Sequence, residues 1–368
     1  MIPVNTPLFA GNERKYLLEC IDTGWVSSEG PFVERFERAM ADKCGRKHGI
    51  AVCNGTAALD IAVEALDLKP GDEVIVPTFT IISCVQQIVR ASATPVLVDA
   101  NPDTWTMDVD QIEAKISSRT RAIMVVHIYG LPTNMEPILD LCARYDLALI
   151  EDAAEAHGQH YRDTPCGGFG EMSTFSFYPN KHVTAGEGGM IVTDRDDLAA
   201  QCRSLRNLCF KPEARFEHDR LGWNYRITNM QAAIGLAQVE RLAETVERKK
   251  RMGALYQELL EEVEGIRLPL PSTDYAENHY WVFGLVLENS GKTVQDIVTA
   301  LADRKIGTRP FFHPMHMQPV LRKMGLFDNE SYPVAENLRE CGFYLPSGVA
   351  LSDGQIEEVA SAVKEILA

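Results

Sequence analysis

Between residues 49 and 193, seven short apolar runs alternate with stretches whose apolar residues recur at helical spacing. Several runs are almost continuous Val, Ile and Ala, which is typical of strands covered on both faces. The runs lie at 49–53, 73–76, 95–98, 122–126, 148–150, 173–177 and 190–193, and covering helices are predicted at 57–66 and 136–145. This alternation predicts an α/β fold with a mixed, mostly parallel sheet flanked by helices.

The sequence pattern of the chain changes after residue 229. A helical pattern continues to about residue 264, and Pro269 and Pro271 end it. A smaller α+β unit is predicted to follow. Its elements are a strand at 281–287, a helix at 293–305, a strand at 307–311 and a closing helix from Asp353. We therefore expect two domains, a large one at 1–245 and a small C-terminal one at 246–368.

The charge of the chain excludes two classes of partner. Its formal net charge is −16, without a long run of one sign. A repelling surface argues against general binding of nucleic acid or of anionic membranes. No apolar run reaches the roughly 18 residues of a membrane span, and residues 1–5 lack the pattern of a leader peptide. We therefore expect a soluble, cytoplasmic protein.

Cysteine and histidine spacing gives no sign of a metal site or of disulfides. The nine cysteines are scattered, and none forms a Cys-x-x-Cys pair. We expect them to be reduced and mostly buried, because unpaired cysteine packs as a small hydrophobic residue. Prolines interrupt the pair His313 and His316, so no helical ligand pair is expected.

Ligands of α/β sheets gather at the carboxyl ends of the strands, so ligand-binding residues are expected in the loops after the predicted strands. Gly55, Thr56 and Ala57 open a helix, where free N–H groups and the helix dipole favour a phosphate. A simple turn and helix cap is the other interpretation. Asp152 ends a second strand. A buried carboxylate needs a cationic partner such as a protonated pyridine nitrogen, although capping of the next helix is equally compatible with the sequence.

Lys181 follows the run at 173–177 and precedes the glycine-rich segment 186–189. A lysine held in a cleft can lose its proton and become a nucleophile, whereas a single lysine elsewhere is usually a solvated charge. The combination with the loops of Gly55 and Asp152 favours the nucleophile. The polar segment 222–229 is ambiguous by itself, since Arg226 could be a surface or packing charge.

Short segments along nearly the whole chain match a known family in the same order. They are Gly-Asn-Glu at 11–13, Asn-Gly-Thr-Ala-Ala-Leu at 54–59, Gly-Asp-Glu-Val at 71–74, Glu-Asp-Ala-Ala at 151–154, Lys181, Gly-Glu-Gly-Gly at 186–189 and Asn-Tyr-Arg at 224–226. On these segments the chain resembles the DegT/StrS family of sugar aminotransferases. The resemblance implies the fold-type-I architecture of aspartate aminotransferase and the cofactor pyridoxal 5′-phosphate (PLP).

The resemblance also implies roles for individual residues. Lys181 bonds covalently to the cofactor and then carries the proton, Asp152 pairs with the pyridine nitrogen, and Glu155 lies beside the ring. The remaining cofactor-binding positions are Gly55, Thr56, Ala57 and Ser176 around the phosphate, Ile81 at the ring, and Asn224, which reaches the phosphate in the neighbouring subunit. This last role implies a homodimer with shared active sites.

Two positions depart from the family pattern. Many members carry a ring-stacking aromatic residue where this chain has Ile81, so π-stacking at that position is lost. Glu155 stands where glutamine is common. Neither change removes an essential chemical group.

The segment 309–316 is similar to its counterpart in GDP-perosamine synthases. This similarity implies transfer of an amino group from L-glutamate to C4 of GDP-4-keto-6-deoxymannose. Arg309 and His313 are candidate substrate contacts, but a proline-locked turn that buries Phe311 explains them equally well. The alternatives are a dTDP- or UDP-linked 4-keto or 3-keto sugar, a dehydratase of the same fold with histidine in place of the lysine, and a non-catalytic regulatory protein.

Overall fold

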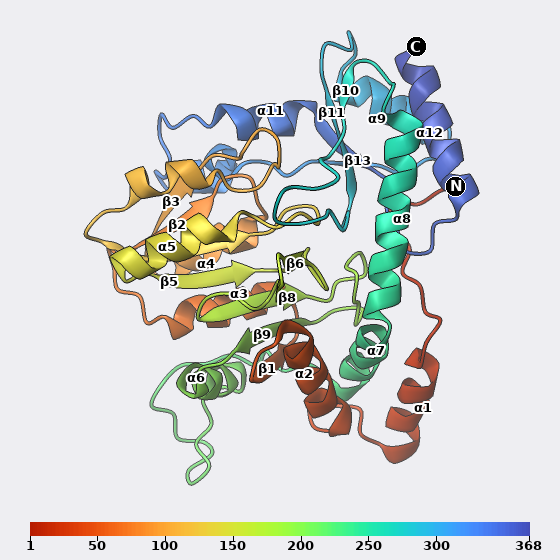
Figure 1. Ribbon diagram of the computed structural model, residues 1–368. Helices are drawn as coiled ribbons and strands as arrows, with labels where there is room; N and C mark the ends of the chain where they lie inside the picture. The colour runs from red at the N-terminus through yellow and green to blue at the C-terminus, as the bar shows by residue number, and fades with distance from the viewer.

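The computed structural model describes residues 1–368 and is built around a seven-stranded sheet (Figure 1). Its strand order is β1-β9-β8-β5-β4-β2-β3, and only β9 runs antiparallel to its neighbours. The strands are β1 (His48–Val52), β2 (Glu73–Pro77), β3 (Thr94–Val98), β4 (Thr120–Val126), β5 (Ala148–Asp152), β8 (Met172–Ser176) and β9 (Gly189–Thr193). Each of the seven predicted runs forms one of them, which confirms the predicted α/β fold.

Helices cover both faces of this sheet. Because successive side chains of a strand point to opposite faces, Val74 and Val76 of β2 pack on one side and Ile75 on the other. The first face is covered by α3 (Gly55–Ala65), α4 (Ile82–Arg90) and α6 (Asp196–Arg206). The second is covered by α2 (Pro31–Cys44), α5 (Met135–Tyr145) and α7 (Asn229–Glu240). Helix α1 (Glu13–Thr23) packs against α7.

The prediction of one long helix from residue 229 to about 264 is wrong. The segment forms two helices, α7 and α8 (Leu242–Leu260), because Arg241 between them leaves the helical region with φ −110° and ψ 13°. The two helices serve different cores. Leu236 of α7 packs with the large sheet, whereas Tyr256 of α8 packs with the C-terminal sheet. Figure 1 shows α8 running from one unit to the other.

The C-terminal unit contains a four-stranded sheet in the order β10-β11-β13-β12. Its strands are β10 (Ile266–Arg267), β11 (Phe283–Leu287), β12 (Arg309–Pro310) and β13 (Gly342–Leu345), and its helices are α9 (Val294–Asp303), α10 (Pro319–Lys323), α11 (Pro333–Cys341) and α12 (Asp353–Leu367). The strand predicted at 307–311 is reduced to two residues, because Pro310 has no N–H for a ladder. Strand β13, which joins β11 to β12, was not predicted.

Residues near the start of the chain lie against the C-terminal unit rather than the large sheet. The N–H of Ile2 donates to Lys305 O at 2.8 Å, and the N–H of Gly307 donates to Ile2 O at 2.8 Å. The N–H of Ser347 donates to Val4 O at 2.9 Å. None of the helices is both long and apolar enough to cross a membrane.

Candidate active site

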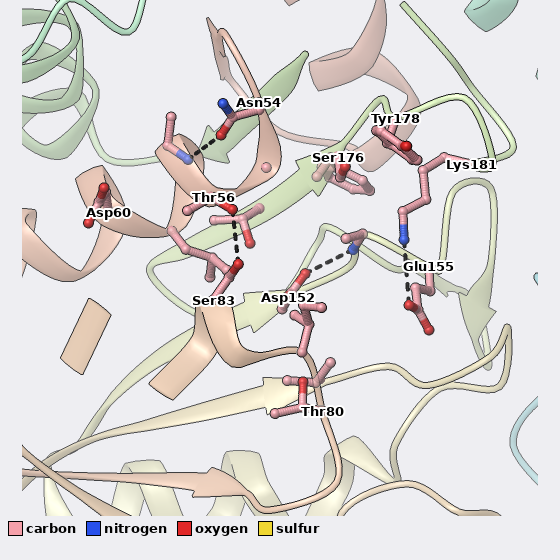
Figure 2. Close-up of a pocket in the computed structure, with 18 of the residues that line it drawn as sticks. Asn54, Thr56, Asp60, Thr80, Ser83, Asp152, Glu155, Ser176, Tyr178 and Lys181 are labelled. Carbon is pink, nitrogen blue, oxygen red and sulfur yellow. Dashed lines mark hydrogen bonds and ion pairs between the residues drawn. The ribbon is translucent and has the colours of Figure 1, made fainter. Parts of the chain in front are cut away.

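A cavity of about 760 Å³ opens at the carboxyl ends of the large sheet's strands, and residues of the C-terminal unit form part of its wall. The loops after β1, β2, β4, β5 and β8 all contribute to it. This is the edge where parallel strands and helix N-termini converge, so both backbone dipoles and strand-end side chains face the same space. Figure 2 shows the polar side chains that gather there.

The N-terminus of α3 forms one end of the cavity. The side chain of Asn54 caps the helix by accepting a hydrogen bond from Ala57 N at 2.8 Å. The N–H groups of Gly55 and Thr56 therefore have no acceptor within the helix. Gly55 lies so close to β8 that a Cβ there would meet the Cβ of Ser176 at 2.7 Å. The glycine thus lets a hydroxyl-bearing strand end and a helix N-terminus share one small space.

Asp152 ends β5 and is fully buried at the floor of the cavity. One carboxylate oxygen accepts from Ala154 N at 3.0 Å, and the other accepts from the Cys84 thiol at 3.3 Å. No lysine, arginine or histidine nitrogen lies within 4.0 Å of it. Burial is the main cause that raises the pKa of Asp152. Such a carboxylate is poised to meet a cation supplied by a ligand.

Lys181 and Glu155 meet at the opposite end of the cavity. The Lys181 ammonium lies 3.5 Å from Glu155 Oε1, and the two side chains are 10% and 8% exposed (Figure 2). The other oxygen of Glu155 accepts from Tyr129 N at 2.9 Å. Burial raises the pKa of Glu155 to about 7, against the opposing effect of Lys181. Glu155 can therefore hold or release a proton near neutral pH.

Most of the predicted cofactor residues lie in this one cavity. Those that line it are Gly55, Thr56, Ala57, Ile81, Asp152, Glu155, Ser176 and Lys181. Ile81 is 43% exposed, so its side chain is available at the mouth of the site. Asn224 is not part of the lining: its side chain is exposed and accepts from Arg226 Nε at 2.8 Å.

The two predicted substrate contacts lie outside the lining. Arg309 is exposed on β12, directly across from Tyr344, a residue of β13 that does line the cavity. His313 faces a separate cavity, and its Nε2 lies 3.1 Å from Met317 O. The other interpretation of this segment, a proline-locked turn that buries Phe311, also has support, because Phe311 is buried in the core.

Sequence reasoning missed much of the cavity wall. The C-terminal unit contributes Trp281, Phe312 and Tyr344. Helix α4 contributes Gln86 and Arg90, which with Ser83 recur at the i, i+3, i+7 spacing of one helix face. That spacing was a usable signal for α4, whereas the three aromatic residues are indistinguishable from core residues in the sequence.

One buried histidine and one buried cluster of three residues take no part in the cavity. The ring of His182, next to Lys181, is buried away from the lining, and burial lowers its pKa well below the ordinary value. His127, Glu151 and Cys166 have ligand atoms within 4.8 Å of one another. The Glu151 carboxylate, however, already lies 2.9 Å from the His127 ring and accepts from Gly167 N, Phe169 N and Ser173 Oγ. The cluster is therefore satisfied by its own hydrogen bonds.

The residues of the cavity fit the cofactor that the resemblance implies. Free N–H groups at Gly55 and Thr56, together with the nearby Ser176, suit a phosphate. The buried Asp152, without a cation of its own, suits a protonated pyridine nitrogen. Lys181 supplies the amine that a carbonyl-containing cofactor requires. Thr174, whose buried hydroxyl lines the cavity without any hydrogen-bond partner, offers one more polar contact.

Comparison with known proteins agrees with this geometry. Residues 8–364 match the DegT/DnrJ/EryC1/StrS aminotransferase family. A GDP-perosamine synthase from Caulobacter vibrioides is 43% identical over 368 residues, which cover 100% of this chain and 98% of the relative. A GDP-perosamine synthase from Vibrio cholerae is 38% identical, with 99% and 98% covered. The solved structure of an aminotransferase, TlmJ from Streptoalloteichus hindustanus, has a TM-score of 0.93 at 29% identity, covering 100% of this chain and 99% of that one.

Proposed function

The chain belongs to the DegT/DnrJ/EryC1/StrS aminotransferase family, and from this membership we propose that it makes GDP-perosamine by transferring an amino group from L-glutamate to C4 of GDP-4-keto-6-deoxymannose. The observation that carries the proposal is the 43% identity to a GDP-perosamine synthase over the full length of both chains. The cofactor of the enzyme is PLP. When bound, it would carry the amino group from the donor to the keto carbon, and its ring would serve as the electron sink for the carbanion formed on the way.

We propose that five residues hold the cofactor. Gly55, Thr56 and Ser176 meet the phosphate at the N-terminus of α3, and Asp152 meets the pyridine nitrogen. Lys181 provides the covalent attachment. The ionised Asp152 keeps the pyridine nitrogen protonated, which maintains the electron-withdrawing character that the chemistry requires.

Lys181 and Glu155 are proposed to handle the proton. Once its amine is free, Lys181 can remove the proton from the α-carbon of the donor in the first half-reaction, and it can deliver a proton to C4 of the acceptor in the second. Glu155 lies 3.5 Å from the amine and has a pKa of about 7 because it is buried. It can therefore stabilise the charged amine or accept its proton at neutral pH. The position of His182 away from the cavity opposes the dehydratase alternative, in which histidine replaces the lysine.

One cation of the cavity wall, Arg90, supports an anionic substrate, although the wall also carries carboxylates such as Asp60 and Glu187. Arg90 lines the cavity and has no carboxylate within ion-pair distance. In a chain with a net charge of −16, such a local cation is a means of attracting a pyrophosphate. We propose Arg90 as one contact inside the cavity. Arg309, across the strand pair from Tyr344, remains a proposed contact beside the cavity, and His313 remains one although it faces a separate cavity.

A homodimer is proposed as the working form of this cytoplasmic enzyme. Asn224 is exposed and does not line the cavity of its own chain, which is compatible with service to a neighbouring site. The preceding loop exposes Phe216 and Leu221 by 82% and 89%, and it projects from the large unit (Figure 1). Exposed apolar side chains of this kind are typical of surfaces that a partner covers.

One assay tests the reaction and the substrate together. The purified protein is incubated with PLP, glutamate and a panel of GDP-, dTDP- and UDP-linked keto sugars, and release of 2-oxoglutarate is followed. The GDP-linked 4-keto sugar should have the highest kcat/KM. Clearly faster turnover of a dTDP- or UDP-linked sugar would overturn the substrate proposal, and no 2-oxoglutarate with any sugar would overturn the amino-transfer proposal.

A further inference from the structure

Trp281 lies against the amine of Lys181. The lysine nitrogen is 3.8 Å from the centroid of the indole ring, well inside the roughly 6 Å at which a cation is attracted to a ring face. Trp281 lines the cavity from the C-terminal unit and is itself buried. The ammonium group thus rests between the indole face and the carboxylate of Glu155.

Trp281 is held at its ring and at its backbone. The indole Nε1–H donates to Asn180 O at 2.8 Å, which ties the ring to the residue before Lys181. The backbone carbonyl of Trp281 accepts from the buried Lys249 side chain at 2.7 Å. The ring also stacks on Tyr129, with centroids 5.9 Å apart and an interplanar angle of 27°. Because Tyr129 N donates to Glu155, both partners of the Lys181 amine are held by one framework.

We propose that Trp281 is a positioning residue for Lys181: it holds the lysine loop through the indole N–H and guides the amine through the ring face. The inference rests on the proposed function only in taking Lys181 as the residue that bonds to the cofactor. Every other proposed cofactor residue belongs to the unit of the large sheet. Trp281 would be the contribution of the C-terminal unit.

Trp105 is a buried tryptophan without a contact to Lys181 and serves as the comparison for Trp281. It is as buried as Trp281 and packs edge-on against Phe311 and Tyr129, but it lines no part of the cavity and its Nε1 has no hydrogen-bond partner. Trp281 has both a partner for its N–H and a cation on its ring. Trp105→Leu is therefore a matched control for the loss of a buried indole.

The test measures how fast Lys181 bonds to PLP in cofactor-free protein. In that step the neutral amine bonds to the aldehyde carbon of PLP and one water molecule leaves. Absorbance is followed after rapid mixing over a range of PLP concentrations. The rate at saturation reports the bonding step, and the half-saturating concentration reports the binding that precedes it. Borohydride reduction and peptide mapping identify the lysine that is attached in each variant.

Trp281→Leu should lower the saturating rate on the order of ten- to a hundredfold while the half-saturating concentration changes little, because only the placement of the amine is disturbed. Trp281→Phe keeps a ring face but lacks the N–H that donates to Asn180 O, so it should recover part of the rate. Trp105→Leu should leave both values unchanged. A native or higher saturating rate in Trp281→Leu would overturn the proposal, and equal losses in the leucine and phenylalanine variants would overturn the role of the ring face.

If Trp281→Leu fails to fold, a protein that keeps a side chain of the same size at this position can still test the proposal. Only one of the four tryptophans, Trp281, lines the cavity. Protein made with fluorinated tryptophan keeps the ring shape and the N–H but weakens the attraction of the ring for a cation, so the neutral amine forms more readily and the saturating rate should reach its plateau at a lower pH. An unchanged pH profile of the saturating rate would overturn the role of the ring. Attachment of PLP to another lysine would overturn the site in the proposed function as well, and the mapping distinguishes the two failures.

Discussion

Two carboxylates, Asp152 and Glu155, lie three positions apart in the chain and meet different partners in the cavity. Asp152 accepts from a backbone N–H and a thiol, whereas Glu155 faces the Lys181 ammonium. Burial is the leading cause that raises the pKa of each. Both carboxylates are buried, and they differ in the groups that they contact. Asp152 therefore suits a position beside a ring nitrogen, and Glu155 suits one beside an amine.

Glu155→Gln is expected to remove a pH-dependent loss of stability from the cofactor-free protein. Because burial raises the pKa of Glu155 from 4.5 to about 7, the folded chain holds a proton in this window that the unfolded chain has released. Stability therefore falls as the pH rises through the window, by about 1–3 kcal/mol in total. Glutamine has no proton to lose and keeps an acceptor for Tyr129 N.

Urea unfolding at about pH 5 and about pH 7.5 measures this effect. The variant should gain free energy of unfolding relative to the native protein at the higher pH. An equal difference at both pH values would contradict the raised pKa of Glu155.

Arg309→Ala is expected to weaken use of the sugar nucleotide more than the half-reaction with glutamate. Glutamate carries no pyrophosphate, so a charge at the rim matters only for the acceptor. Loss of one charge-assisted contact corresponds to about 1.5–3 kcal/mol, or roughly ten- to a hundredfold in kcat/KM. Arg38→Ala, which removes an exposed arginine of α2 paired with Glu34, is the control. Equal losses in both half-reactions would remove Arg309 from the substrate site.

At the scale of elements, the N-terminus of α3 depends on a residue without a side chain. Gly55→Ala should weaken PLP binding by about tenfold or more and destabilise the fold by about 1–3 kcal/mol, because the new Cβ would meet Ser176 at 2.7 Å. Gly354 lies in the first turn of α12 with open space around it. Gly354→Ala should be neutral or stabilising. PLP titration and urea unfolding compare the two; unchanged PLP affinity in Gly55→Ala would show that the approach to Ser176 is not needed.

Helix α8 buries a lysine without a carboxylate partner. Burial lowers the pKa of Lys249 from 10.5 to about 7, and its amine donates to the carbonyls of Trp281 and Ser347. Between these pH values the unfolded chain binds a proton that the folded chain lacks. The contribution of Lys249 to stability therefore rises with pH across this window.

Lys249→Met removes that dependence. The native protein should gain about 1–3 kcal/mol in free energy of unfolding relative to the variant between about pH 7 and pH 9. Lys250→Met is the control for losing a lysine from the same helix, since Lys250 pairs with Glu277 at the surface. A difference that stays constant with pH in Lys249→Met would mean that the buried amine keeps its proton throughout.

The elements that could be predicted from the sequence are those whose pattern is local. The strands of the large sheet are covered on both faces, so each appears as an apolar run, and the loops that follow them carry Gly55, Asp152 and Lys181. The break at Arg241 was missed because the apolar spacing continues across it. Trp281 and Tyr344 reach the cavity only through the packing of the second unit, and no local pattern marks them.

For the molecule as a whole, we propose a division into units at residues 245 and 246, inside α8. Leu242 and Val246 pack with the core beneath the large sheet, whereas Met252 and Leu260 pack with the C-terminal sheet. The helix therefore belongs to one unit at its start and to the other at its end. Because the cavity is lined from both units, a change in their relative placement would alter the distance between Trp281 and Lys181.

The proposed dimer predicts complementation between two inactive proteins. Lys181→Ala removes the amine of its own cavity, and Asn224→Ala removes the contact offered to the neighbouring one. A mixed dimer should then contain one intact site and recover up to about half of the native activity per dimer. Activity is measured after subunit exchange, with mixed dimers isolated by two different affinity tags. Failure of verified mixed dimers to recover activity would contradict shared sites.

The hydrogen bonds of Ile2 and Val4 to the C-terminal unit constrain the order in which the chain can fold during synthesis. Residues 2–4 leave the ribosome well before the large sheet, but their partners at 305, 307 and 347 are translated after it. The contacts within the sheet at 48–193 are more local in the chain. The sheet can therefore form before residues 2–4 have met their hydrogen-bond partners. Attachment of residues 2–4 becomes a late event that completes the C-terminal unit.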